Sequence, residues 1–407
     1  MTCEPDLFDS IDDEARLIGL VDDACLLVSD GMIAWVGGRK EFEAGGHRAS
    51  KVIDAGGLAV IPGLVDAHTH TVFAGTRERE YEMRVKGAGY MEIAARGGGI
   101  NATVAAVRNA SIDELVASGS SRVRSMLRQG TTTVEIKSGY GLSVEAELKM
   151  LRAIRRVGDE TCVDVVATFM GAHEIPPELR ANRDRYVDIV IDEMIPAVGE
   201  EGLAEFCDVF CEQGVFTADE SRRILLRGKD CGLRPKIHAD EFVESGGAAV
   251  AGEVGAISAG HLGHASREGL KAMKDAGTVA VLMPGVSVGL GRPEFADARG
   301  MIDMGLDVAV ATDFNPGSSM VHSLLIVSSL ACSFMKMTPA EVILAMTVGG
   351  AKAVGRQDRV GSIAPEKQAD LILLEVPDFR YVPYHLGGEV VRMVIKNGNV
   401  VFDRTQD

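Results

Sequence analysis

The segment from Asp66 to His70 reads Asp-Ala-His-Thr-His and closes an apolar run that begins at Leu58. If that run is a β-strand, its side chains alternate between two faces, so His68 and His70 project the same way from its carboxyl end. Two imidazoles side by side form half of a metal site. A His-x-His pair also occurs by chance in loops. The pair therefore indicates a metal site only if the rest of the chain supplies the remaining ligands.

The elements that would position such a site are eight short apolar runs between residues 59 and 355, separated by helix-like stretches. The clearest helix covers Ser143–Val157, where Leu148, Leu151 and Ile154 lie near helical spacing. Alternation of this kind is typical of a parallel sheet. The runs are Ala59–Val65, Thr132–Ile136, Val163–Phe169, Val209–Cys211, Lys236–Ile237, Ala256–Ser258, Thr278–Leu282 and Val308–Ala311.

Eight βα units predict an α/β fold, a (β/α)8 TIM barrel, with its active site at the carboxyl ends of the strands. A doubly wound open sheet is the alternative, but no GxGxxG motif follows the first strand. Asp313 and five of the nine histidines stand at that rim; the histidines are His68, His70, His173, His238 and His261. By itself His173 or His261 would more often be structural, but the shared rim favours a functional role.

A cluster of imidazoles with one carboxylate is the ligand set of a divalent transition metal such as Zn or Fe, with positions left open for water. Such an ion lowers the pKa of its water towards neutrality and polarises a carbonyl oxygen. The sequence therefore predicts metal-dependent hydrolysis.

Both ends of the chain are predicted to be β-rich. Ala24–Val28 and Met32–Val36 flank Asp30-Gly31, a hairpin signal. Because an isolated hairpin is marginal in water, we expect the two ends to pack into one small composite β-sandwich domain; two unrelated appendages are the alternative. The predicted domains are residues 1–58, 59–355 and 356–407. The C-terminal strands are expected at Ala369–Leu374, Val390–Ile395 and Lys396–Val401.

Composition limits the partners and the compartment. The chain of 407 residues has 42 Lys and Arg against 59 Asp and Glu, a net charge of -17, which argues against nucleic acid. Its seven cysteines form no CxxC pair and fit reduced thiols. The acidic N-terminus is unlike a secretory signal, and no apolar run approaches the ~18 residues of a membrane span. We expect a cytoplasmic enzyme with a small-molecule substrate and no membrane partner.

The sequence resembles the amidohydrolase superfamily in the run Pro62–His70, in the single histidines after strands five and six, and in Thr312-Asp313 after strand eight. The resemblance spans nearly the whole chain and is greatest to the branch that opens an imidazolone ring in histidine degradation. The matching segments are His68–Arg77, Gly97–Ile100, Glu135–Gly141, Gly171–His173, Asp208–Glu212, His238–Glu241 and Thr312–Gly317.

This resemblance implies that the (β/α)8 barrel is distorted and holds one Zn or Fe ion per chain, and that the enzyme is a homodimer. Binuclear relatives commonly carry a carbamylated lysine after strand four, where this chain has Glu212 and Gln213, which favours one metal. Lys137, after strand two, is then structural or electrostatic. The implied metal ligands are His68, His70, His238 and Asp313.

The implied substrate is 4-imidazolone-5-propanoate, a cyclic amide with a carboxylate tail, and the implied product is N-formimidoyl-L-glutamate. A carboxylate tail calls for a cation and hydroxyl donors. Without the resemblance, Arg77 would be a solvated charge and Asn315-Pro316-Gly317 an ordinary turn. The residues implied for the substrate are Arg77, Tyr140, His173 and Glu241, and those for the product's end of the pocket are Asn315, Gly317 and Ser318.

In the implied mechanism, water activated by the metal attacks the ring carbonyl while His261 stabilises the oxyanion. Asp313 carries the water's proton to the leaving ring nitrogen, and Glu241 hydrogen-bonds the ring or the water. Two positions depart from the family pattern: Gly260 replaces an acidic residue before His261, and Glu366 replaces a glycine in a surface turn.

Two other functions stay open at this point. One is another cyclic amidohydrolase or a metal-dependent deaminase on the same scaffold, which would use different groups for the substrate tail. The other is a non-catalytic relative that has lost ligands. Arg77, Tyr140 and His173 together favour the imidazolone hydrolase over the first, and the complete ligand set disfavours the second.

Overall fold

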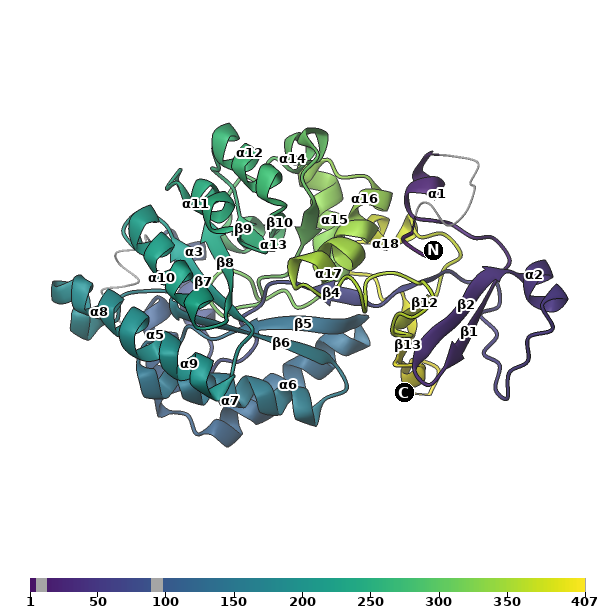
Figure 1. Cartoon of the computed structure of the whole chain (residues 1–407), viewed down its shortest axis with the longest axis horizontal. Helices are drawn as coiled ribbons and strands as arrows, with labels where there is room; N and C mark the ends of the chain where they lie inside the picture. Colours follow the sequence, from purple (N-terminus) through teal and green to yellow (C-terminus); the bar gives the residue numbers. More distant parts are fainter. Residues whose placement is uncertain (5–12, 89–97, 407) are drawn as a thin grey trace.

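The structure is a computed structural model that describes residues 1–4, 13–88 and 98–406. Eight parallel strands follow one another around a barrel in chain order, which confirms the predicted (β/α)8 architecture (Figure 1). They are β4 (Leu64–Asp66), β5 (Thr131–Lys137), β6 (Asp164–Ala172), β7 (Phe206–Cys211), β8 (Arg234–Ala239), β9 (Ser258–His261), β10 (Val279–Leu282) and β11 (Val308–Val310).

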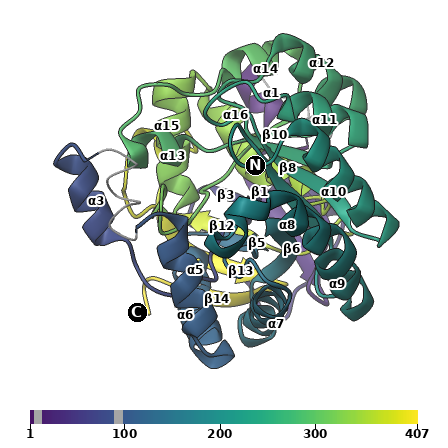
Figure 2. The ribbon, with the colours of Figure 1, turned by 90° about the vertical axis from the view of Figure 1, so that its left-hand side faces the viewer.

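Helices surround this barrel on its outer side (Figure 2). The predicted helix at 143–157 is α7 (Val144–Glu160); the Ser143 hydroxyl accepts from the amide of Ala146, and its buried stripe includes Leu151 and Ile154. The other helices of the barrel are α3 (Glu78–Val85), α5 (Ile100–Asn109), α6 (Ile112–Arg128), α8 (Arg183–Ile189), α9 (Ile195–Glu201), α10 (Ala218–Asp230), α11 (Gly247–Val254), α12 (Arg267–Ala276), α13 (Pro284–Leu290), α14 (Ala298–Met304), α15 (Leu324–Met335), α16 (Pro339–Leu344) and α17 (Gly350–Ala353).

The barrel closes through the segments that follow its first and last strands. The amide of Asp313 donates to the carbonyl of His68 at 3.0 Å, and the amide of His70 donates to the carbonyl of Phe314 at 3.0 Å. Asp66 adds a side-chain bond, because its carboxylate accepts from the hydroxyl of Thr312 at 2.7 Å. Candidate metal ligands thus sit on the backbone that completes the barrel, which fixes their separation.

The predicted first strand, 59–65, is two strands that serve two sheets. β3 (Val60–Pro62) pairs with β12 (Leu371–Leu374) in the small domain, whereas β4 begins the barrel. Gly63 makes the change possible, since a Cβ there would lie 2.2 Å from Oγ1 of Thr132. Pro62-Gly63 interrupts the apolar run at this point, so the sequence does carry a signal for the division, although hydrophobicity alone does not show it.

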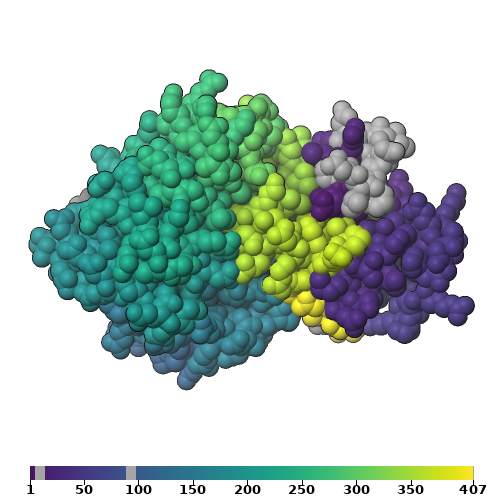
Figure 3. Space-filling model, viewed as in Figure 1, coloured from purple at the N-terminus to yellow at the C-terminus, as the bar shows by residue number. Residues whose placement is uncertain are grey.

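The two ends of the chain lie side by side beside the barrel (Figures 1 and 3). The hairpin of β1 (Ala24–Ser29) and β2 (Met32–Gly38) joins the four-stranded sheet through a bridge between Met32 and Gln368. That sheet has the order β14-β13-β12-β3, with β13 at Val391–Lys396 and β14 at Asn399–Asp403. Ile33 and Leu371 are buried in the core shared by these sheets. The remaining short helices are α1 (Asp13–Leu17), α2 (Arg39–Ala44) and α18 (Tyr381–Tyr384).

Among the helices of the described residues, none combines the length and apolar character needed for a bilayer crossing.

Candidate active site

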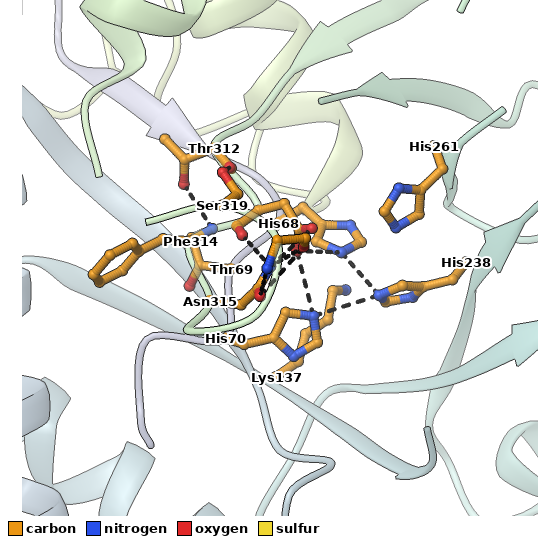
Figure 4. A network of polar contacts seen from close by, with 12 residues as sticks. His68, Thr69, His70, Lys137, His238, His261, Thr312, Phe314, Asn315 and Ser319 are labelled. Carbon is orange, nitrogen blue, oxygen red and sulfur yellow. Dashed lines mark hydrogen bonds and ion pairs between the residues drawn. The ribbon is translucent and has the colours of Figure 1, made fainter. Parts of the chain in front are cut away.

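The side chains of His68, His70 and His238 converge at the carboxyl end of the barrel (Figure 4), and the carboxylate of Asp313 lies against the first two. Nε2 of His238 lies 3.0 Å from Nε2 of His68 and 3.4 Å from Nε2 of His70. Oδ1 of Asp313 lies 3.6 Å from Nε2 of His68 and 3.5 Å from Nε2 of His70. All four side chains are buried, so these atoms face one another rather than solvent.

This donor set fits a tetrahedral transition-metal ion. With bonds of about 2.0–2.1 Å, the donor atoms around such an ion stand about 3.4 Å apart, and the observed contacts of 3.0–3.6 Å bracket that value. Oδ1 of Asp313 is buried and accepts no hydrogen bond from the described residues. A buried carboxylate oxygen without a donor indicates a place for a cation.

The protonation states of these histidines and of Asp313 also agree with a metal site. Burial, followed by nearby positive charges, lowers the pKa of His68 and His70 well below its usual value, so both rings are neutral and offer lone pairs. Burial raises the pKa of the Asp313 carboxyl to about 8. Burial thus disfavours the anion of Asp313, and a bound metal would stabilise it.

A buried charge network orients His238. Its Nδ1 lies 3.0 Å from Oδ1 of Asp208, which leaves Nε2 aimed at the other ligands. The other carboxylate oxygen of Asp208 accepts from Nζ of Lys137 at 2.7 Å. Burial opposes ionisation of Asp208, but the Lys137 charge and the contact with His238 outweigh it and lower its pKa far below the usual value. Glu135 completes the network by pairing with Lys137 at 2.9 Å and with Lys236 at 2.8 Å.

His261 and Glu241 lie on the β8 and β9 side of the four ligands. Nε2 of His261 is 3.6 Å from Oε2 of Glu241, and a ligand atom of His261 lies within 4.8 Å of those of His68 and His238. Burial, followed by the charges of Asp313 and Glu212, raises the pKa of Glu241 well above its usual value. Burial and these two carboxylates thus favour the protonated form of Glu241.

Gly260, which precedes His261, packs closely against a candidate metal ligand. A Cβ at this position would lie 2.9 Å from Cε1 of His68 and 3.1 Å from Cε of Met283. A side chain at Gly260 would therefore have to displace these neighbours, and the next residue, His261, has a positive φ of 72°.

Tyr140 and His173 form a wall against His70. The rings of His70 and His173 stack at 4.9 Å, and the Tyr140 ring lies 5.3 Å from that of His173. Nδ1 of His173 donates to the carbonyl of Gly139 at 3.0 Å, because a carbonyl can only accept. Burial lowers the pKa of His173 to about 3, so its Nε2 is an acceptor at neutral pH.

Arg77 lies beside the loop that follows Asp313. Its Nε and Nη2 bind Glu80 at 2.9 and 2.7 Å, and its Nη1 faces Gly317, where a Cβ would come within 2.4 Å. Oδ1 of Asn315 accepts from the amides of Gly317 at 2.8 Å and Ser318 at 2.9 Å. The structure thus places Arg77 next to the loop of Asn315, Gly317 and Ser318, the three residues predicted for the product's end of the pocket.

The sequence did not single out Asp208, Glu135 or Lys236 as functional. Asp208 was one residue outside the predicted fourth strand, whereas β7 begins at Phe206 and places Asp208 beside His238. Charged residues inside strands normally signal a solvent face, and only barrel closure makes these meet. The matched segment beginning at Gly97 lies partly outside the described residues, since Gly97 is not among them.

Solved structures with this architecture include 5-methylcytosine deaminase from Klebsiella pneumoniae, with a TM-score of 0.72, 17% identity and coverage of 93% of this chain and 94% of that one. Guanine deaminase from E. coli superimposes with a TM-score of 0.71 at 16% identity, covering 94% of this chain and 93% of that one. At such identities the likeness concerns the fold alone.

Residues 59–401 match the amidohydrolase family, and the chain belongs to that family of metal-dependent hydrolases. Its similarity to curated relatives is more specific. It is 50% identical to the imidazolonepropionase of Geobacillus kaustophilus (strain HTA426), covering 94% of this chain and 91% of the relative. It is 45% identical to that of Alkaliphilus oremlandii (strain OhILAs), covering 96% and 93%. Within the amidohydrolases, the chain is a member of the imidazolonepropionase group.

Proposed function

We propose that this enzyme hydrolyses the cyclic amide of 4-imidazolone-5-propanoate to N-formimidoyl-L-glutamate, the third step of histidine degradation. The observation that carries the proposal is the convergence of three neutral imidazoles and one carboxylate at the rim of a barrel that is related over nearly its whole length to imidazolonepropionases. The homodimer and the cytoplasmic location stay predictions.

We propose that one Zn or Fe ion binds to His68, His70, His238 and Asp313. When bound, the ion supplies Lewis-acid polarisation of the ring carbonyl and acidifies water. The network behind His238 supports one ion: Lys137 is fully buried and its ammonium is held by Glu135 and Asp208 at 2.9 and 2.7 Å. Because its ammonium is engaged by these two carboxylates, Lys137 supports His238 through Asp208 and would not act as a ligand of a second ion.

The substrate's ring would lie against Tyr140 and His173, and its tail would reach Arg77. The neutral Nε2 of His173 can accept a ring N–H, because Nδ1 already donates to Gly139. The tail carboxylate would take the Nη1 donors of Arg77, which the ion pair with Glu80 leaves facing Gly317. Asn315 and Ser318 belong to the same loop as Gly317 and would hold the product.

Three side chains would move or stabilise charge. Asp313 would take the proton of the attacking water and deliver it to the leaving ring nitrogen, as general base and then general acid. His261 faces the centre from β9 and would stabilise the developing oxyanion. Glu241, 3.6 Å from His261, would hydrogen-bond the ring or the attacking water.

The test is to mix purified, metal-analysed protein with freshly generated 4-imidazolone-5-propanoate and to follow the ring chromophore and the product by mass spectrometry. The proposal expects formimidoylglutamate to form with loss of the ring absorbance. Release of ammonia would favour a metal-dependent deaminase instead. An unchanged ring, in protein with about one metal per chain, would favour a hydrolase of another cyclic amide.

A further inference from the structure

The loop between β5 and α7, residues 138–142, is held by one buried carboxylate. Glu147 is 0% exposed and lies on α7. Its Oε2 accepts from the amide of Gly139 at 3.0 Å, and its Oε1 accepts from the amides of Gly141 at 2.7 Å and Leu142 at 2.9 Å. Three backbone donors thus converge on a single anion, as they would on a bound ligand.

The carbonyl side of the same loop is held by a guanidinium. Nε of Arg108 donates to the carbonyl of Gly141 at 2.7 Å, and its Nη2 donates to that of Leu142 at 3.0 Å. Nη1 of Arg108 also pairs with Glu178 at 2.7 Å. Because Glu178 follows the strand that ends next to His173, Arg108 links residues 138–142 to the segment after that strand.

The loop contacts two of the rings at the candidate site, those of His70 and His173. Its Tyr140 ring lies 5.7 Å from that of His70, and its Gly139 carbonyl fixes Nδ1 of His173. Gly139 has φ +105°, and a Cβ there would lie 2.8 Å from Nδ1 of His173. A small shift of this backbone would therefore move both rings.

We propose that Glu147 and Arg108 are positioning residues that clamp residues 138–142 and so set the affinity for the imidazolone substrate. This inference rests on the proposed function. Glu147 has no place in the proton transfers, and a buried carboxylate on three amides makes charge-assisted hydrogen bonds stronger than neutral ones. The clamp holds Tyr140 and His173 in place before the substrate arrives, which reduces the entropy lost on binding.

The test compares Glu147→Gln with Glu145→Gln, a matched change on the exposed face of the same helix. Glutamine keeps the shape but turns one acceptor oxygen into a donor that faces a backbone amide. We expect KM for 4-imidazolone-5-propanoate to rise about 10-fold in Glu147→Gln while kcat stays within about twofold, with the metal content unchanged. Glu145→Gln should match the wild type.

Two further readouts separate this role from general structural damage and from failure of the proposed function. Hydrogen exchange of the peptide covering residues 138–142 needs no substrate, and it should accelerate in Glu147→Gln and not in Glu145→Gln. In a double-mutant cycle, Glu147→Gln and Tyr140→Phe should be non-additive in kcat/KM, because both act through one ring. Unchanged exchange, additive effects or a loss confined to kcat would overturn the clamp. An inactive wild type with accelerated exchange in the variant would overturn only the proposed function.

Discussion

Asp208→Asn tests the network behind the metal ligands. Asp208 accepts from the backbone amide of His238 at 3.1 Å, contacts Nδ1 of the same residue at 3.0 Å and pairs with Lys137 at 2.7 Å. Asparagine has the same shape, but when its oxygen accepts from His238 its amide N–H₂ faces the Lys137 ammonium. The change therefore places two donors against each other in a site with 1% exposure at Asp208.

Two magnitudes follow from this geometry. Loss of a carboxylate behind a ligating histidine costs roughly 10- to 100-fold in metal affinity, or about 1.4–2.7 kcal/mol. Lys137 keeps Glu135 at 2.9 Å, so the folded state loses one of two buried partners, a cost of about 3 kcal/mol. Metal affinity and the free energy of unfolding should both fall, while Lys137 stays paired.

The assay is competition for Zn²⁺ against a chromophoric chelator, with denaturant unfolding of the metal-free protein alongside. Asp219→Asn is the matched control, since Asp219 is 79% exposed and pairs with Arg222 at 3.2 Å on the surface. A metal dissociation constant within twofold of wild type in Asp208→Asn, or an equal loss in the control, would refute the reasoning.

Three other predictions concern the site. Asp313→Asn should retain part of the metal but lower kcat at least about 100-fold, because the proton carrier is gone; kcat and metal content measured on one preparation check this. Arg77→Gln should raise KM about 10- to 100-fold in steady-state assays, because the tail carboxylate loses its charged partner. Gly260→Ala should lower bound metal per chain, measured by elemental analysis, since a Cβ would lie 2.9 Å from Cε1 of His68.

Each of these three predictions would be contradicted by a specific result. Substantial turnover by Asp313→Asn would remove its role as proton shuttle. An unchanged KM in Arg77→Gln would mean that the pairing with Glu80 is the whole role of that cation. Full metal loading in Gly260→Ala would show that β9 moves to accept a methyl group and that the close packing on His68 carries little energy.

The barrel and the gathering of histidines at its rim were predictable because they depend on local patterns, whereas the choice of four metal ligands came from the family resemblance and stays a prediction. Apolar runs mark the strands, and in a parallel barrel every strand presents its carboxyl end at one rim, so residues after the strands meet there. β9 shows the limit of this reasoning. The apolar residues suggested Ala256–Ser258, but pairing with β8 and β10 places the strand at Ser258–His261. His261 therefore ends a strand rather than following it.

The supporting residues were not predictable for a different reason. Glu135, Asp208 and Lys236 come from three strands, and each alone looks like a solvent-facing charge; Lys137 was expected to be structural or electrostatic, but its partners were not predicted. Their burial is favourable only because barrel closure brings two cations to two carboxylates. The role of Glu147 was not predictable either, since its three donors belong to a loop whose conformation depends on Gly139 and Gly141. The local sequence shows which charged residues are present but not how close their side chains lie in the folded barrel.

The measurement that tests the central claim most directly is a metal titration of stripped protein during ring opening. Zn²⁺ or Fe²⁺ is added to chelator-treated enzyme in the presence of 4-imidazolone-5-propanoate, and formimidoylglutamate is quantified at each step. With His68, His70, His238 and Asp313 as a single site, activity should rise from near zero to a plateau at one equivalent per chain. Ring opening by the stripped protein, or a plateau at two equivalents, would contradict it.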